Sequence, residues 1–108
     1  MPVIDPHRLA EDRSVAYHRV VADRLEADPA ILERARALVQ RWREVDPSGP
    51  YAEEWAGILS MPIEEMKRAL VEDSEAGKAR RQATPFAGAI PPRERWKLWR
   101  LVREELSR

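Results

Sequence analysis

The chain has 108 residues, 19 basic and 19 acidic side chains, and no cysteine. This length fits one small domain with a modest core, and the missing cysteines exclude disulfides, thiolate nucleophiles and cysteine metal sites, as expected in a reducing cytoplasm. A net charge of zero argues against a generic nucleic-acid coat, and no apolar run approaches the ~18 residues needed to span a bilayer.

We predict an all-α fold in a single domain, because apolar residues recur at three- and four-residue steps and no segment alternates as a strand does. Residues 1–11 contain two prolines and are expected to form an irregular tail. Asp28-Pro29 should end the first helix and begin the second, since aspartate is a good N-cap and proline fits the first turn. These first two helices are predicted to form an antiparallel hairpin. The predicted helices lie near residues 13–27, 29–44, 51–59, 61–80 and 92–107.

The fourth predicted helix carries its apolar stripe only as far as Val71. Residues 72–82 contain almost no apolar side chains, so that half is expected to be exposed, frayed or covered by something else. The segment 83–91 follows, nearly uncharged and bounded by prolines. Because proline fixes φ and restricts the residue before it, we expect an extended loop here.

Catalytic and metal chemistry find little support in the sequence. His7 and His18 do not have metal-site spacing and are predicted to be solvated or capping residues. The paired carboxylates are adjacent in sequence, so on a helix they point to different sides. The four glycines are scattered and form no phosphate-binding loop. We therefore predict no catalytic residue, no metal and no cofactor.

Residues 51–82 have a helix–break–helix outline, which keeps a DNA-binding regulator open as an alternative. The second helix of such a motif would enter the major groove. Its first turn here contains Glu64 and Glu65 and has no side chain suited to reading base edges. We expect at most weak, nonspecific DNA binding. A homo-oligomeric helical scaffold is the second alternative.

The charge is unevenly distributed along the chain. Residues 46–76 hold eight acidic and two basic side chains, whereas residues 77–108 hold nine basic and three acidic ones. Two interpretations follow. Either the two segments complement each other within one fold, or the basic segment faces an acidic partner.

The last predicted helix interleaves Trp96 and Trp99 with five basic residues. It could pack as a core stripe, or it could form an interface, because tryptophan and arginine dominate binding hot spots. The same two possibilities exist for Phe86: its side chain packs in the core, or it docks into a partner. We favour docking for Phe86, whose loop is held by prolines, and the core for Trp99, which shares a face with Val102 and Leu106.

Two stretches carry a resemblance: Arg81-Gln82-Ala83-Thr84-Pro85-Phe86-Ala87-Gly88 and Pro92-Arg93-Glu94-Arg95-Trp96. They resemble a group of small all-helical bacterial proteins of unassigned activity, and the resemblance spans about residues 14–103. This group is similar to the antitoxin halves of toxin–antitoxin modules, which bind and block a toxin enzyme. The resemblance implies a non-catalytic module that neutralises a cognate toxin. The implied contact residues are Arg81, Gln82, Pro85, Phe86, Arg93, Arg95 and Trp96.

Overall fold

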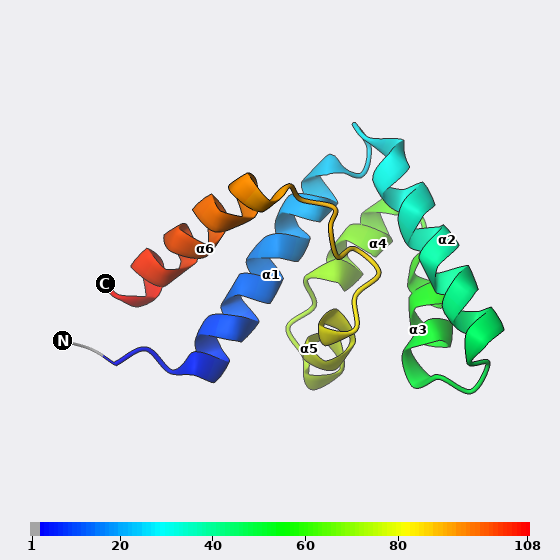
Figure 1. Ribbon diagram of the computed structural model, residues 1–108, viewed down its shortest axis with the longest axis horizontal. Helices are drawn as coiled ribbons and strands as arrows, with labels where there is room; N and C mark the ends of the chain where they lie inside the picture. The colour runs from blue at the N-terminus through cyan, green and yellow to red at the C-terminus, as the bar shows by residue number, and fades with distance from the viewer. Residues whose placement is uncertain (1–2) are drawn as a thin grey trace.

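The computed structural model describes residues 3–108, and this part of the chain contains six helices and no strand. The helices are α1 (Pro6–Arg24), α2 (Pro29–Val45), α3 (Pro50–Ile58), α4 (Ile63–Leu70), α5 (Glu75–Gln82) and α6 (Pro92–Leu106). The all-α prediction is therefore confirmed (Figure 1).

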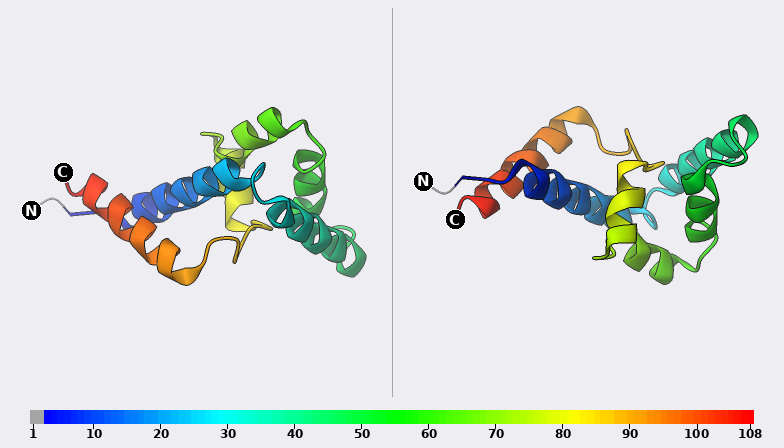
Figure 2. Two further views of the ribbon diagram at one scale, coloured as in Figure 1. Left: turned by 90° about the horizontal axis from the view of Figure 1, so that it is seen from above. Right: turned by 90° about the horizontal axis from the view of Figure 1, so that it is seen from below.

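Helix α1 is the central element of the fold. It contacts α4, α5 and α6, whereas α2 packs mainly on α3. Figure 2 shows α6 alongside α1, with α2 and α3 gathered at the far end of the molecule. The predicted hairpin of the first two helices is thus wrong, because the apolar stripe of α2 is buried against α3 instead of α1. The resulting shape is elongated, with extents of 48 × 30 × 24 Å.

The N-terminal segment differs from the predicted irregular tail. Helix α1 begins at Pro6, and the carboxylate of Asp5 accepts a hydrogen bond of 3.0 Å from the backbone N–H of His7. This is an N-cap followed by a proline in the first turn. The boundary predicted at Asp28-Pro29 is also correct, but the side chain of Asp28 forms no capping hydrogen bond. The first two residues lie outside the described part of the chain.

The predicted helix over residues 61–80 is in fact two helices. Helix α4 ends at Leu70, close to the point where the apolar stripe ends, and α5 begins after Ser74. The Ser74 hydroxyl caps α5 by accepting a hydrogen bond of 2.9 Å from the N–H of Gly77. The second half of the predicted helix is therefore covered along one side, the third of the expected possibilities, because it folds back as α5 against α1, α3 and α4.

The close return of the chain between α4 and α5 requires a glycine at position 77. A Cβ there would collide with the backbone carbonyl oxygen of Glu72, whereas a Cβ at Gly57 in α3 would meet no atom within 4 Å. We expect Gly77→Ala to lower the free energy of unfolding by about 1–3 kcal/mol. The matched Gly57→Ala change should instead raise it by up to about 1 kcal/mol, because alanine has the higher helix propensity. Urea denaturation of both variants checks this pair, and a stabilised Gly77→Ala protein would contradict the described turn.

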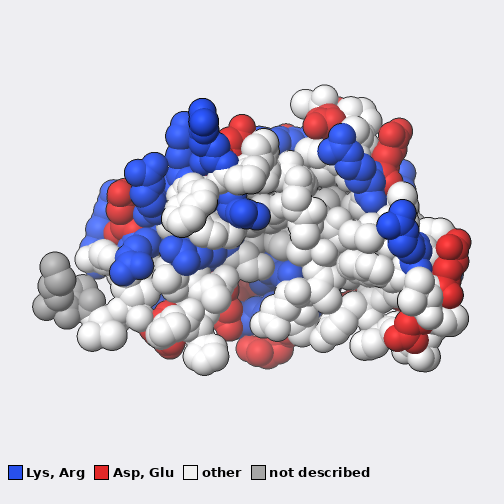
Figure 3. All heavy atoms as spheres, in the orientation of Figure 1, with Lys and Arg blue, Asp and Glu red and all other residues white. Residues whose placement is uncertain are grey.

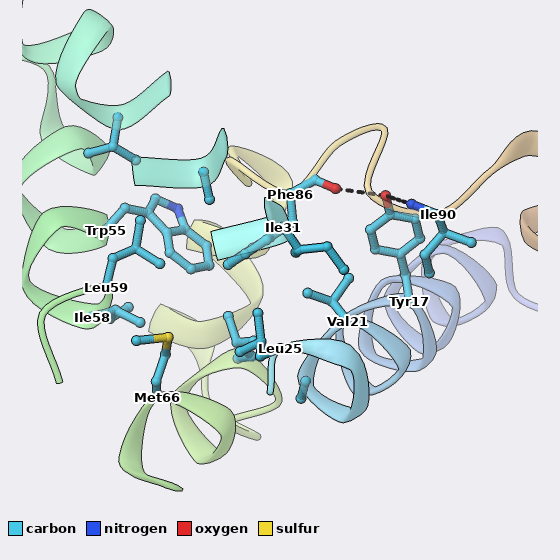
Figure 4. Packing of buried hydrophobic residues seen from close by; sticks show 14 residues of the cluster. Tyr17, Val21, Leu25, Ile31, Trp55, Ile58, Leu59, Met66, Phe86 and Ile90 are labelled. Carbon is cyan, nitrogen blue, oxygen red and sulfur yellow. Dashed lines mark hydrogen bonds between the residues drawn. The ribbon is translucent and has the colours of Figure 1, made fainter. Parts of the chain in front are cut away.

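The hydrophobic core is formed by α1, α2, α3, α4 and the segment 83–91, while α6 contributes no fully buried residue. Its largest fully buried side chains include Trp55, Phe86, Met66 and Leu70. Figure 4 shows these elements converging, with Trp55 and Met66 on one side and Tyr17 and Ile90 on the other. No helix within residues 3–108 is long and apolar enough to cross a bilayer.

The proline-bounded segment 83–91 lies before the last helix, as predicted, and it is folded into turns. The N–H of Ala89 donates to the carbonyl oxygen of Phe86 at 3.1 Å. Gly88 is the third residue of this turn and has φ of +83°, a conformation that side chains with a Cβ rarely adopt. The segment therefore turns back on itself and points Phe86 inward, whereas a straight loop would hold it out.

Candidate functional site

Tyr17 fastens the segment 83–91 to the central helix. Its hydroxyl donates a hydrogen bond of 2.7 Å to the carbonyl oxygen of Phe86 and accepts one of 3.3 Å from the N–H of Ile90. Figure 4 shows both bonds converging on the tyrosine oxygen. The segment 83–91 is therefore held against α1 through the backbone of two of its residues, Phe86 and Ile90.

The docking hypothesis for Phe86 is wrong for the folded chain. The side chain is only 1% exposed, and its ring packs edge-on against Trp55 at 5.9 Å and against His18 at 6.3 Å between ring centroids. Pro85 is buried beside it. Both residues stabilise the core instead of meeting a partner, because the turn at residues 86–89 directs the ring into the gap between α1 and α3.

His18 is likewise neither solvated nor a cap. It is 2% exposed, with Nδ1 2.7 Å from the carbonyl oxygen of Ser14 and Nε2 2.7 Å from the hydroxyl oxygen of Thr84. A carbonyl oxygen can only accept, so Nδ1 carries the proton and Nε2 accepts from Thr84. Burial, opposed by the Ser14 bond and assisted by the positive charge of Arg81, lowers the pKa of His18 to about 4. The imidazole is therefore neutral near pH 7. His7 is exposed, as predicted.

Arg81 was expected at an interface, but it lies in the interior together with Arg80. Nη1 of Arg81 donates to the carbonyl oxygens of Glu72 at 2.9 Å and of Leu70 at 3.4 Å. Nη2 of Arg80 donates to the carbonyl oxygen of Ala69 at 2.8 Å. These oxygens lie at and just beyond the end of α4, where helical carbonyls have no partner of their own. The two arginines thus cap α4 from α5.

The acidic and basic segments complement each other only in part. Arg80 pairs with Glu54 at 3.2 Å and with Glu72 at 3.3 Å, so α5 does neutralise the acidic segment. The cations of α6 do not reach it. In the described part of the chain, no carboxylate lies within 4.0 Å of the positive groups of Arg93, Arg95, Lys97, Arg100 and Arg103.

Helix α6 packs against α1 along one side. Trp99 is half-buried, with its ring centroid 6.0 Å from that of Tyr17 and the guanidinium of Arg13 5.8 Å above it. The expected packing of Trp99 against the core is thus confirmed, although the residue keeps part of its surface. Arg95 lies on this inner side and is also half-buried. Of the three predicted contact residues on α6, Arg95 therefore lies on the inner side, whereas Arg93 and Trp96 do not.

The outer side of α6 presents what we call the basic row: Arg93, Trp96, Arg100 and Arg103. Their spacing of three, four and three residues places them along one flank of the helix, and Trp96 is 66% exposed. Figure 3 shows Lys and Arg side chains gathered over this part of the surface. The sequence singled out Arg93 and Trp96, and the helical spacing adds Arg100 and Arg103 to them. Gln82, at the end of α5, is exposed but lies outside the row.

Two hollows flank the segment 84–87. The first has a volume of about 390 Å³ and lies between α1, α5 and α6, and we call it the arginine-lined hollow because Arg13, Arg81 and Arg95 contribute to its wall. The second has a volume of about 510 Å³ and lies between the end of α2, the start of α3 and the end of α5. Its walls are mainly apolar. Sequence reasoning missed both hollows, because each is built from elements far apart in the chain.

No group of three or more His, Asp or Glu side chains within residues 3–108 is arranged to hold a metal ion. Comparisons of the chain with protein-family models, curated proteins and solved structures find no match.

Proposed function

We propose that this chain is a non-catalytic protein-binding module that uses the basic row on α6 to bind an acidic segment of a partner protein. The observation that carries the proposal is that one side of this helix is exposed and its cations are unpaired in the described chain. It packs against α1 through one side only and exposes a tryptophan between arginines that have no carboxylate partner in the described chain.

The chemistry of the row favours a carboxylate-bearing partner. Guanidinium groups bind carboxylates through two parallel hydrogen bonds, and such charge-assisted bonds are stronger than neutral ones. Trp96 supplies a large apolar surface at the centre of the row, and tryptophan and arginine are the residue types most enriched in binding hot spots. The row extends about 15 Å along the helix, so an acidic helix or strand would fit it.

The partner implied by the sequence resemblance is a toxin enzyme, which makes this chain an antitoxin-like protein. Contact would then run through α6 alone, because the second element favoured by the sequence, the segment around Phe86, is part of the core. We place the complex in the cytoplasm, consistent with the absence of cysteine.

The test is a charge reversal with a matched control. We expect the double variant Arg93→Glu/Arg100→Glu, and also Trp96→Ala, to bind the protein encoded by the neighbouring gene at least about 30-fold more weakly. The control is Arg34→Glu/Arg41→Glu. It makes the same charge change at the same seven-residue spacing on α2, where both arginines are exposed. Calorimetry at ~0.15 M salt measures all three affinities.

Each other outcome contradicts part of the proposal. If only the α2 control lost binding, the interface would lie at the second, mainly apolar hollow, which Arg41 borders. Full binding by all variants would exclude the basic row, and no complex with the neighbouring protein would exclude the antitoxin role. Submicromolar, sequence-specific binding of duplex DNA at the same salt concentration would favour the regulator alternative.

A further inference from the structure

The arginine-lined hollow gathers three positive side chains from three different helices. Arg13 comes from α1, Arg81 from α5 and Arg95 from α6, and no Asp or Glu is among the residues that line the hollow. Nor does any of the three form an ion pair within residues 3–108. Asp73, Glu72 and Glu11 lie near enough to Arg81 to act on its charge without forming an ion pair, so the positive charge of the hollow is only partly offset, and an anion between the arginines would be stabilised there.

Two of these arginines also have unused hydrogen-bond donors. The Nε–H groups of Arg13 and Arg81 are buried and have no partner among the described residues. Arg81 is 3% exposed and is fixed in place by the carbonyl oxygens at the end of α4. Leaving a buried donor of a charged group unpaired is costly. An oxyanion beside these guanidinium groups would stabilise them by neutralising their charge, although the Nε–H groups themselves are too buried to reach it.

The rest of the wall indicates what else the ligand contains. The rings of Tyr17 and Trp99 and the methyl groups of Ala10 and Ala87 line the hollow. The hydroxyl of Tyr17 is already used, since it donates to Phe86 and accepts from Ile90. These surfaces therefore offer apolar contact, and the polar recognition comes from the arginines.

We propose that the arginine-lined hollow binds a small organic oxyanion, a carboxylate or phosphate group attached to a planar apolar body. The volume of about 390 Å³ falls in the range of small-molecule sites and far exceeds that of a bare inorganic ion. The oxyanion binds to the guanidinium groups of Arg13, Arg81 and Arg95, and the apolar body lies against Trp99. This site is separate from the basic row, which is on the outer side of the same helix.

The experiment uses benzoate and phenyl phosphate as probes on the intact chain. We expect saturable binding of at least one of them by calorimetry. In ¹⁵N-resolved spectra the Nε–H resonances of Arg13 and Arg81 should move on binding, because the anion changes the electric field at these guanidinium groups. Arg95→Ala should weaken binding by about 10- to 100-fold, the effect of removing a hydrogen bond to a charged group. Lys97→Ala, which removes an exposed cation two residues away that belongs neither to the hollow nor to the basic row, should leave it unchanged.

Several results would overturn the proposal. Equal binding by the Arg95→Ala and Lys97→Ala proteins would place the anion elsewhere, and so would unmoved Nε–H resonances. If benzyl alcohol bound as tightly as benzoate, the negative charge of the ligand would not contribute to binding. If inorganic phosphate bound as tightly as phenyl phosphate, the apolar wall would not contribute. Absence of saturable binding by both probes would reject the site. The variant Arg81→Lys tests the third arginine of the hollow. Because Arg81 also caps α4, the folding of this variant is checked before its affinity for the probes is interpreted.

Discussion

Replacement of Phe86 by alanine should lower the free energy of unfolding by about 3–5 kcal/mol, because it removes a fully buried ring and leaves a cavity that its neighbours cannot close. The ring is 1% exposed and contacts Trp55 and His18, and the backbone of its turn is held by Tyr17. Urea denaturation at pH 7.5 measures the change.

The control for this change is Trp96→Ala, which removes an even larger ring. Because Trp96 is exposed on α6, its removal should alter stability by no more than about 0.5 kcal/mol. Small domains are stable by only about 5–15 kcal/mol, so Phe86→Leu is included as a milder change that should destabilise the fold less. A Phe86→Ala protein as stable as the unaltered chain would show that this segment does not belong to the core.

Acidification should destabilise the fold through His18. Its folded pKa of about 4 lies below the ordinary value of 6.5, so the unfolded chain takes up this proton first as the pH falls. Stability from this group is complete above pH 6.5 and is lost progressively down to about pH 4. Between pH 7.5 and pH 4.5 we expect a loss of about 2–3 kcal/mol from His18 alone. Denaturation at four pH values across this interval measures the slope.

Two variants separate this histidine from the other groups that titrate in acid. His18→Gln should be less stable than the unaltered protein at pH 7.5, because the bonds to Ser14 and Thr84 are disturbed, but its stability should depend less on pH. His7→Gln should keep the full dependence, since His7 is exposed at the start of α1. If the two variants showed the same slope, the buried imidazole would not be the origin of the acid sensitivity.

The sequence by itself determined the helical class and several helix boundaries. Apolar spacing and caps such as Asp28-Pro29 act within one or two turns, so they can be recognised without knowing what packs against them. The same local signals were present at Asp5-Pro6 and at Ser74, where the prediction overlooked them. The sequence left open whether α6 forms a core stripe or an interface, but two of the contact residues that it singled out there, Arg93 and Trp96, are exposed.

Only the tertiary structure decided which of the remaining side chains are available to a partner. Phe86 lies in a turn, where no periodicity indicates a direction, and its position depends on Tyr17, 69 residues earlier in the chain. The sequence pattern places Arg81 at a solvated helix end. It is buried because α4 ends at Leu70 and the chain then turns back, so that α5 packs against the end of α4. The arginine-lined hollow exists only because α1, α5 and α6 meet. Burial depends on contacts between elements distant in sequence, and local patterns do not contain that information.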